Sequence, residues 1–242
     1  MTANEMADKL ELRLNKVNSF AAYGYEDVEI SSFLNSAQSL YIQEFVDELN
    51  NRKGQGFEEG ELRTLGFSNL IESTVLPVSA NQLGKFPNGV CYNTPTTSLG
   101  FIHESPTSNK TVCGSEEFII PTVVVVSHDE YARWIRNSYR RPYINEYDGV
   151  VWRMYLNNKR VQLITDGSYN ITSYFVKYLR PPVPITVDRV TPSNQVNCEL
   201  GYAIGTGINP VHETIIDIAI RLIDNSNLEQ RPPLTPNGEQ LN

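Results

Sequence analysis

The sequence predicts an α+β protein in which N- and C-terminal helices build a helical bundle and an antiparallel β lobe is inserted between them. Apolar residues recur at intervals of three or four near both ends of the chain, as amphipathic helices require. Between these ends, short runs of β-branched and aromatic residues alternate with turn-forming residues, which is typical of strands. Because the helices lie at the two ends, we expect them to pack together and the strands to form a separate lobe.

Three helices are predicted in the N-terminal quarter. Thr2 and Glu5 have the spacing of a capping box, and a helical apolar pattern follows, so the first helix is expected over residues 3–17. A second helix is expected over residues 26–49, and a third, interrupted by a glycine, over residues 59–72. The apolar face of the second helix consists of Ile30, Phe33, Leu34, Ala37, Leu40, Tyr41, Phe45 and Leu49.

The centre of the chain is less regular. Residues 73–117 are rich in Pro, Gly, Asn, Ser and Thr, which predicts short strands and long loops without fixing their positions. The run FIIPTVVVV predicts a buried strand with Pro121 near its start, where a missing N–H does least harm. Ser127 and Glu130 form a second capping-box pattern, which predicts a short helix over residues 128–139.

Three further strands and a last helix complete the pattern. The runs GVVWRMYL, VQLITD and ITSYFVKYL are separated by short polar turns, which predicts an antiparallel meander or a pair of hairpins. Asn209 and Pro210 then have the pattern of an N-cap and a first helical residue. The expected buried side of this helix consists of Val211, Ile215, Ile216, Ile218, Ala219 and Leu222.

A proline cluster, RPPVP, follows the last predicted strand. Pro181 and Pro184 satisfy P-x-x-P, so the cluster could be a ligand for another protein, a hinge, or the end of a sheet. We favour strand termination, because the prolines directly follow a period-two pattern and proline cannot continue a strand ladder. In that position the fixed φ angles of the prolines would set the direction in which the chain leaves the lobe.

Four parts of the chain are expected. Residues 1–72 and 209–225 form a discontinuous helical body, and residues 73–187 form the inserted β-rich lobe with the short helix 128–139. Residues 188–208 form a connecting loop. Residues 226–242 form an extended C-terminal tail, because they contain many prolines and few apolar residues.

Charge argues against two classes of partner. The chain has 28 acidic and 20 basic residues, a net charge of −8, which disfavours general adhesion to nucleic acid or to an anionic membrane. Residues 1–75 carry 6 basic and 13 acidic side chains, whereas residues 131–182 carry 9 and 3. The N-terminus lacks the apolar segment of a signal peptide and no run is long enough to span a bilayer, so we expect synthesis in the cytoplasm and no membrane.

The motifs that could carry catalysis are incomplete. Ser127, His128 and Asp129 are adjacent, but consecutive residues at a helix N-terminus point in different directions and cannot form a relayed triad. The loop GYAIGTGINP has neither phosphate-binding glycine pattern. The nearest carboxylates for a carbohydrate- or peptidoglycan-acting enzyme are Glu146, Asp148 and Asp166, and nothing around them supports that reading.

Metal and cofactor sites are not expected either. Cys91, Cys113 and Cys198 have no C-x-x-C spacing, which indicates neither a disulfide framework nor a zinc site. His103 and His128 lie far apart in sequence, and His212 is more consistent with packing or the surface than with a ligand role. We therefore expect no catalytic, cofactor-binding or metal-binding residue, and no enzyme activity.

The basic middle segment is the candidate interaction site. Its arginines and lysines are interleaved with tyrosine and tryptophan, a mixture typical of protein interfaces and of single-strand nucleic-acid binding. Since the rest of the chain is strongly acidic, we favour a protein interface or a solvated face. The expected interface residues in this segment are Arg133, Trp134, Arg136, Arg140, Arg141 and Arg180.

The order of these pieces resembles a known family. The helices around LRLNKVNSFAAYGYEDVEISSFLNSAQSLYI, the VVSHDEY turn, the hairpin VWRMYLNNKRVQLIT, the run ITSYFVKYLRPPVPIT and the helix HETIIDIAIRLI are similar to head-to-tail connector proteins of tailed bacteriophages. The likeness is greatest to the ring or adaptor proteins of crAss-like phages. It extends over residues 10–50 and 119–225, and residues 73–117 do not match the pattern.

The resemblance implies a structural virion protein in the phage neck. Such proteins form a ring, commonly of twelve copies, beneath the portal protein, contact neighbouring ring or tail proteins, and let genomic DNA pass through the lumen without specific binding. It also implies that a C-terminal segment docks on the portal, which would involve Arg231, Pro232 and Pro233. Another virion ring or a tail-tube component is the alternative, and the enzyme named above is a further one.

Overall fold

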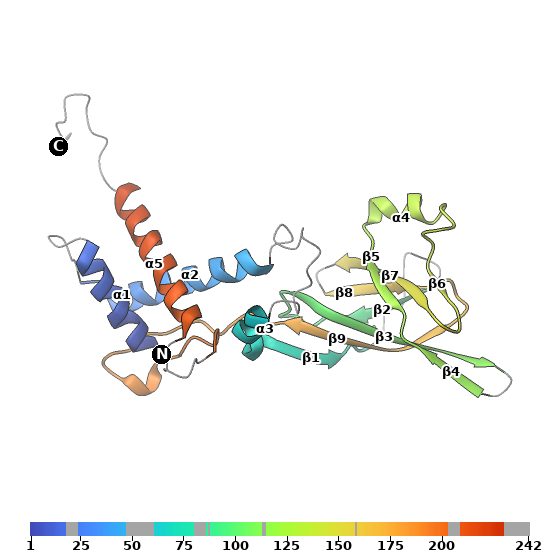
Figure 1. The fold of residues 1–242 in the computed structure, drawn as a ribbon, viewed down its shortest axis with the longest axis horizontal. Helices are drawn as coiled ribbons and strands as arrows, with labels where there is room; N and C mark the ends of the chain where they lie inside the picture. The colour runs from blue at the N-terminus through green and yellow to red at the C-terminus, as the bar shows by residue number, and fades with distance from the viewer. Residues whose placement is uncertain are drawn as a thin grey trace, which may run out of the picture. The chain divides into compact units, whose positions relative to one another are not determined.

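The computed structural model describes residues 1–17, 24–46, 61–79, 86, 88–112, 115–157, 159–202 and 209–229. The protein is a mixed α/β chain that divides into two compact units, whose elements are labelled in Figure 1. Unit 1 comprises residues 1–70 and 182–242, and unit 2 comprises residues 71–181. Most helices belong to unit 1 and both sheets belong to unit 2.

The described helices of unit 1 agree closely with the expected ones except at the ends of the third helix and of the last helix. They are α1 (Ala3–Val17), α2 (Asp27–Val46), α3 (Glu61–Phe67) with the 3₁₀ turn η3 (Ser68–Leu70), η4 (Pro192–Asn194) and α5 (Pro210–Glu229). The third helix ends earlier than predicted, because Ile71 and Glu72 already pair with a strand of unit 2. The expected tail begins inside α5, which continues to Glu229.

The helices of unit 1 pack through the predicted apolar faces. The helix α5 contacts both α1 and α2, and the α2 side chains Ile30 and Leu34 are fully buried. Leu40 of α2 is exposed, contrary to the expectation, and Leu49 lies outside the described residues. On α5 the buried side includes Ile223, whereas Leu222 is only partly buried. Leu40 and Leu222 lie at the margins of the predicted apolar faces.

Charged side chains also join α1 to α5. Lys9 Nζ lies 2.5 Å from a Glu213 carboxylate oxygen, and the Arg13 guanidinium bonds both Glu213 and Asp217. These neighbours lower the pKa of the Glu213 carboxyl, with the Lys9 hydrogen bond as the largest cause. All of these groups are partly exposed, so the network orients the two helices and contributes little to stability on its own.

The segment that follows unit 2 is tied to α2. Asn35 donates from Nδ2 to the Ile185 carbonyl at 2.9 Å and accepts at Oδ1 from the Ile185 N–H at 2.7 Å. The Val187 N–H donates to Ser31 Oγ at 2.9 Å. The side chain of Asn35 thus replaces a strand partner for this extended segment, which was predicted only as part of the lobe and its connecting loop.

Unit 2 contains two sheets, named sheet A and sheet B here. Sheet A has the strand order β1-β9-β3-β4, and its members are β1 (Ile71–Val75), β9 (Asn170–Leu179), β3 (Gly100–Val112) and β4 (Ser115–Ile119). Sheet B has the order β2-β8-β7-β5, and its members are β2 (Gly89–Asn93), β8 (Arg160–Ile164), β7 (Gly149–Asn157) and β5 (Thr122–Val125), with β6 (Tyr143–Ile144) also paired to β7. The helix α4 (His128–Trp134) follows β5.

The strand predictions are partly confirmed. The runs around β7 and β8 form an antiparallel hairpin, but β9 does not pair with β8 and lies in the other sheet between β1 and β3. The run FIIPTVVVV is not one buried strand, because Pro121 separates β4 of sheet A from β5 of sheet B. The poorly patterned region 73–117 contains β3, which is thirteen residues long.

The two sheets enclose the core of unit 2. Tyr92, Val151 and Leu163 from sheet B pack with Tyr174 and Val176 from sheet A. The chain leaves this core after β9 ends at Leu179, and the boundary between the units falls between Pro181 and Pro182. Strand termination at the proline cluster is therefore confirmed.

Candidate interaction surface

The helix α4 is positioned by the capping box that the sequence indicates. Ser127 Oγ accepts a hydrogen bond from the Glu130 N–H at 3.3 Å, and a Glu130 carboxylate oxygen accepts from the Ser127 N–H at 3.4 Å. The predicted start of the helix is confirmed, whereas its end at residue 139 is wrong, because α4 stops at Trp134. A short helix depends on such a cap, since it has few internal hydrogen bonds.

Aromatic side chains fasten α4 to sheet B. The ring of Trp134 lies 6.2 Å from that of Trp152, and the ring of Tyr131 lies 5.9 Å from the same indole, both in edge-to-face geometry. Trp152 is fully buried on β7, and Phe86 packs against Tyr131 at 4.1 Å. Trp134 is therefore chiefly an anchor of the helix, although it was predicted as an interface residue.

The arginines beside this anchor are exposed. Arg140 stacks over the Trp134 ring at 4.9 Å, and Arg141 donates from Nε to the Ile135 carbonyl at 2.6 Å. Arg133 pairs with Glu130 at 3.5 Å on the same helix. We name Arg133, Arg136, Tyr139, Arg140 and Arg141 the α4 basic surface; its tyrosine is 97% exposed. Four of the predicted interface arginines thus lie together on one short stretch of chain.

The other predicted interface residues do not join this surface. Arg180 follows β9 and its Nε lies 3.1 Å from a Glu72 carboxylate oxygen on β1. Arg231, Pro232 and Pro233 lie outside the described residues. The prediction that all these residues belong to an interface stays a prediction.

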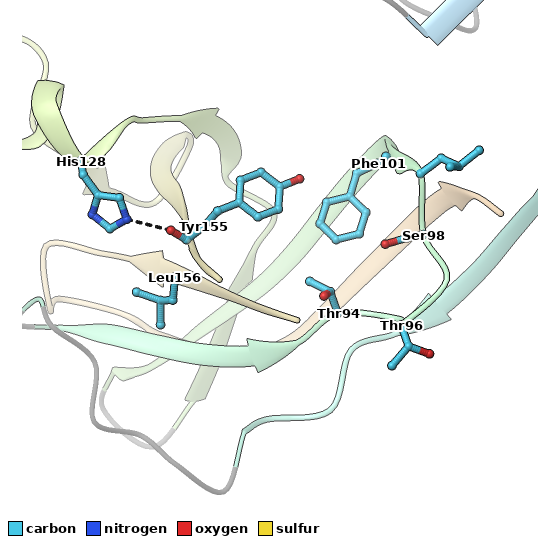
Figure 2. Close-up of a pocket in the computed structure, with 9 residues that line it drawn as sticks. Thr94, Thr96, Ser98, Phe101, His128, Tyr155 and Leu156 are labelled. Carbon is cyan, nitrogen blue, oxygen red and sulfur yellow. Dashed lines mark hydrogen bonds between the residues drawn. The ribbon is translucent and has the colours of Figure 1, made fainter. Parts of the chain in front are cut away.

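A polar hollow lies next to α4. It has a volume of about 700 Å³ and is lined by Thr94, Thr96, Ser98, Leu99, Gly100, Phe101, His128, Tyr155 and Leu156. Figure 2 shows the His128 ring reaching from α4 to the Tyr155 backbone, to whose carbonyl its Nε2 donates at 2.8 Å. This hydrogen bond joins the first residue of α4 to the backbone of β7. Because none of the lining residues is Asp or Glu, the hollow offers hydroxyl groups but no acid–base pair.

Two of the three carboxylates considered for an enzyme, Asp148 and Asp166, stabilise turns. Asp148 accepts from the Tyr143 hydroxyl at 3.0 Å, and the same contact raises the pKa of that phenol. Asp166 accepts from the Ile144 N–H at 3.3 Å and from Ser168 at 2.6 Å. Glu146 is exposed. Local backbone and hydroxyl partners therefore occupy the two aspartates.

His212 and Cys198 are both buried in unit 1. The Nε2 of His212 donates to the Leu200 carbonyl at 2.8 Å, and burial lowers the pKa of its imidazole. Burial raises the pKa of the Cys198 thiol to about 11. Among the described residues, no group of three His, Cys, Asp or Glu side chains is arranged to hold a metal ion. None of the described helices is long and apolar enough to cross a bilayer.

The conformation of Gly201 shows why the glycine-rich loop has a glycine at this position. Its φ of +96° favours glycine, and a Cβ there would lie 2.2 Å from Asn209 Oδ1. Asn209 is the predicted N-cap of α5, and its Oδ1 accepts from the Val211 N–H at 3.1 Å. The glycine lets the chain pass close to this cap, and residues 203–208 of the loop lie outside the described residues.

Unit 1 carries exposed acids that sequence patterns did not place on a surface. Glu5, Asp8, Glu26 and Glu29 are exposed near the N-terminal ends of α1 and α2. The signal was present in the charge of residues 1–75, but charge counts alone do not say which side chains face solvent. The structure thus provides acidic and basic groups on different units of one chain.

Comparison with known proteins gives consistent results over nearly the whole chain. The family described as phage tail ring protein 3/4 matches residues 1–231. The chain is 27% identical over 218 residues to Ring protein 4/5 of Bacteroides phage crAss001, a match that covers 88% of this chain and 84% of that protein. It is 26% identical over 231 residues to Ring protein 3 of the same phage, covering 92% and 94%.

Proposed function

The chain belongs to the phage tail ring protein 3/4 family, and on this basis we propose that it is a structural subunit of a ring in the neck of a phage particle, where the ring joins the portal to the tail. The resemblance to ring proteins of crAss-like phages that the sequence predicts is confirmed by this membership and by both relatives. The related proteins are ring proteins, and no enzyme family is indicated.

The observation that carries the proposal is the separation of charge between the two units. A ring is built from heterologous contacts, in which one patch meets a different patch on the next copy. The α4 basic surface on unit 2 and the exposed acids Glu5, Glu26 and Glu29 on unit 1 supply groups of opposite charge for such a contact. We propose that they face each other between neighbouring copies, where complementary charge fixes the register of association.

The arrangement within the subunit follows from the same proposal. The helices of unit 1 would form the body of the ring as a bundle, and the sheets of unit 2 would be the inserted lobe that reaches neighbouring proteins. A net charge of −8 supports a lumen through which DNA slides without specific binding. Twelve copies, and docking of residues 226–242 on the portal, are further parts of the proposal.

Charge reversal tests the contact between copies. Arg136→Glu and Arg140→Glu should each shift the assembly equilibrium of the purified protein toward monomers, and raised salt should do the same for the unmodified chain. Native mass spectrometry measures the distribution. Arg221→Glu on α5 is the matched control, because it makes the same change in charge at an exposed residue of unit 1 that is not part of the α4 basic surface.

Electron microscopy of the virion tests the role in the particle. A labelled copy of the protein should be located as a ring between the capsid portal and the tail. A location along the tail would favour a tail-tube component instead. The proposal fails if the protein is monomeric in solution and absent from particles.

A further inference from the structure

Sheet A ends in two edge strands that have no strand neighbour on their outer sides in the described structure. These strands are β1 and β4, in the order β1-β9-β3-β4. An edge strand presents a row of unpaired N–H and C=O groups, which can pair with a strand of another chain. The sheet therefore carries two separate pairing surfaces.

The β4 edge lies on an arm. Residues 110–112 of β3 pair only with residues 115–117 of β4, because the pairing of β3 with β9 ends at Asn109 and Asn170. Figure 1 shows the β3–β4 hairpin continuing past the start of β9. Such an arm can reach a neighbouring molecule while the rest of β3 stays in the sheet.

Both edges expose an apolar side chain. Phe118 on β4 is 61% exposed and Val75 on β1 is 57% exposed. Tyr174 and Ile119 pack into the core of unit 2, so their neighbours along each strand lie on the opposite face of the sheet. Val75 lies opposite Phe175 in the register of β1 with β9, which places Val75 on the same outer face as Phe118.

The directions of the two edge strands are matched for association of identical copies. All three strand pairs of sheet A are antiparallel, so β1 and β4 run in opposite directions. In a ring, each copy has the same orientation as the next apart from a rotation about the ring axis. The β4 strand of one copy would therefore meet the β1 strand of the next in an antiparallel sense.

We propose that β4 of each copy pairs with β1 of the next copy, so that sheet A continues from subunit to subunit around the ring. This inference rests on the proposed ring function and names the contact that builds it. The register that places Phe118 opposite Val75 covers two exposed apolar side chains with one another, an aromatic and β-branched pair that stabilises antiparallel strands. The partner is a second copy, because one chain carries both complementary edges.

Cysteine cross-linking tests the proposed pairing. Side chains directly opposite each other on antiparallel strands come close to the Cβ separation that a disulfide needs, most closely in non-hydrogen-bonded pairs. The Val75→Cys/Phe118→Cys variant, in a Cys113→Ser background, should form under mild oxidation a ladder of disulfide-linked oligomers up to the ring. Cys91 and Cys198 can remain, because both are buried. The Ser73→Cys/Phe118→Cys variant tests a register shifted by two residues.

The controls separate this pairing from other contacts. Phe118→Cys alone should give no cross-link; disulfide-linked dimers from it would indicate that two β4 edges meet and would overturn the proposal. Val190→Cys/Phe118→Cys is the matched control, because Val190 is 91% exposed but belongs to unit 1. It should form at least tenfold fewer linked oligomers than the Val75 pair.

Native mass spectrometry of the same variants distinguishes the two proposals. Rings that form without a cross-link in either register overturn the strand pairing and leave the ring function standing. A protein that is monomeric in solution and absent from particles overturns both. As a second measurement, Phe118→Lys should shift assembly toward monomers with an unchanged circular dichroism spectrum, whereas Phe118→Leu should assemble like the unmodified chain.

Discussion

The guanidinium of Arg153 on β7 bonds the carboxylate of Glu104 on β3, and this ion pair links the two sheets of unit 2. Both side chains are largely buried, and the Tyr174 hydroxyl donates to the same carboxylate. The guanidinium also lies 5.2 Å from the Phe101 ring and 4.9 Å from the Tyr155 ring. The contact between the sheets is therefore a polar cluster surrounded by aromatic rings as well as an apolar core.

Replacement of one partner should destabilise unit 2. Arg153→Met leaves the Glu104 carboxylate buried without its cation, so we expect a loss of about 3–5 kcal/mol in the free energy of unfolding. Urea denaturation followed by circular dichroism measures it. The double variant Glu104→Leu/Arg153→Met should recover much of this loss, because it removes both buried charges.

A surface pair provides the comparison. Arg133→Gln removes the exposed contact with Glu130 and should change the free energy of unfolding by about 0–1 kcal/mol. An equal loss for Arg133→Gln and Arg153→Met would contradict the assignment of the buried cluster as the link between the sheets.

Unit 1 should lose stability below neutral pH through His212. Burial holds the pKa of this imidazole below its ordinary value, so the unfolded chain binds a proton more readily than the folded one. Stability is then fully present above about pH 6.5, the ordinary value, and falls as the pH drops below it, by at most about 1.4 kcal/mol per pH unit. Denaturation of the chain at a series of pH values between 7.5 and 5 measures the slope.

The position of the hydrogen on the neutral His212 ring is consistent with the lowered pKa of this imidazole. A carbonyl only accepts, so the hydrogen of the neutral ring is on Nε2, and the buried Nδ1 has no hydrogen-bond partner among the described residues. His212→Gln should flatten the slope between pH 7.5 and 5. Glu213 also contributes to the stability of unit 1, because its carboxyl pKa is lowered in the folded state. This contribution is lost only at more acidic pH, and the loss should persist in the His212→Gln variant. An unchanged slope in His212→Gln would rule out this histidine as the cause.

The capping residue of α4 should control the order of the α4 basic surface. Ser127→Ala removes the side-chain acceptor for the Glu130 N–H, at a cost of about 1 kcal/mol to the helix. Hydrogen exchange should become faster in residues 128–134, and the near-ultraviolet signal of Trp134 and Trp152 should weaken. Ser36→Ala on α2 is the control, because Ser36 Oγ only donates to the Ser32 carbonyl within the helix.

The proline cluster should restrain the passage between the units. Replacing Pro181, Pro182 and Pro184 with Ala releases three fixed φ angles at the boundary between unit 1 and unit 2. We expect normal helix content by circular dichroism but reduced ring assembly by native mass spectrometry. Unchanged assembly would contradict a role for the cluster in directing the chain.

The predictions that succeeded depend on local chemistry. The capping pairs Thr2 with Glu5 and Ser127 with Glu130 both form, and Asn209 caps α5. Each involves groups within three residues of one another, so the pattern contains the whole interaction. The predictions that failed concern partners distant in sequence, such as the pairing of β9 with β1 and β3 in place of β8.

The sequence by itself determined the helix starts, the β7–β8 hairpin, the end of β9 at the prolines, the separation of charge and the family resemblance. Only the tertiary structure decided which sheet each strand joins, that Pro121 divides β4 from β5, and that Trp134 anchors α4. It also decided that Phe118 and Val75 are exposed at the two edges of one sheet. The physical reason is that caps and turns close over a few residues, whereas strand pairing and burial depend on segments far apart in the chain that meet only after folding.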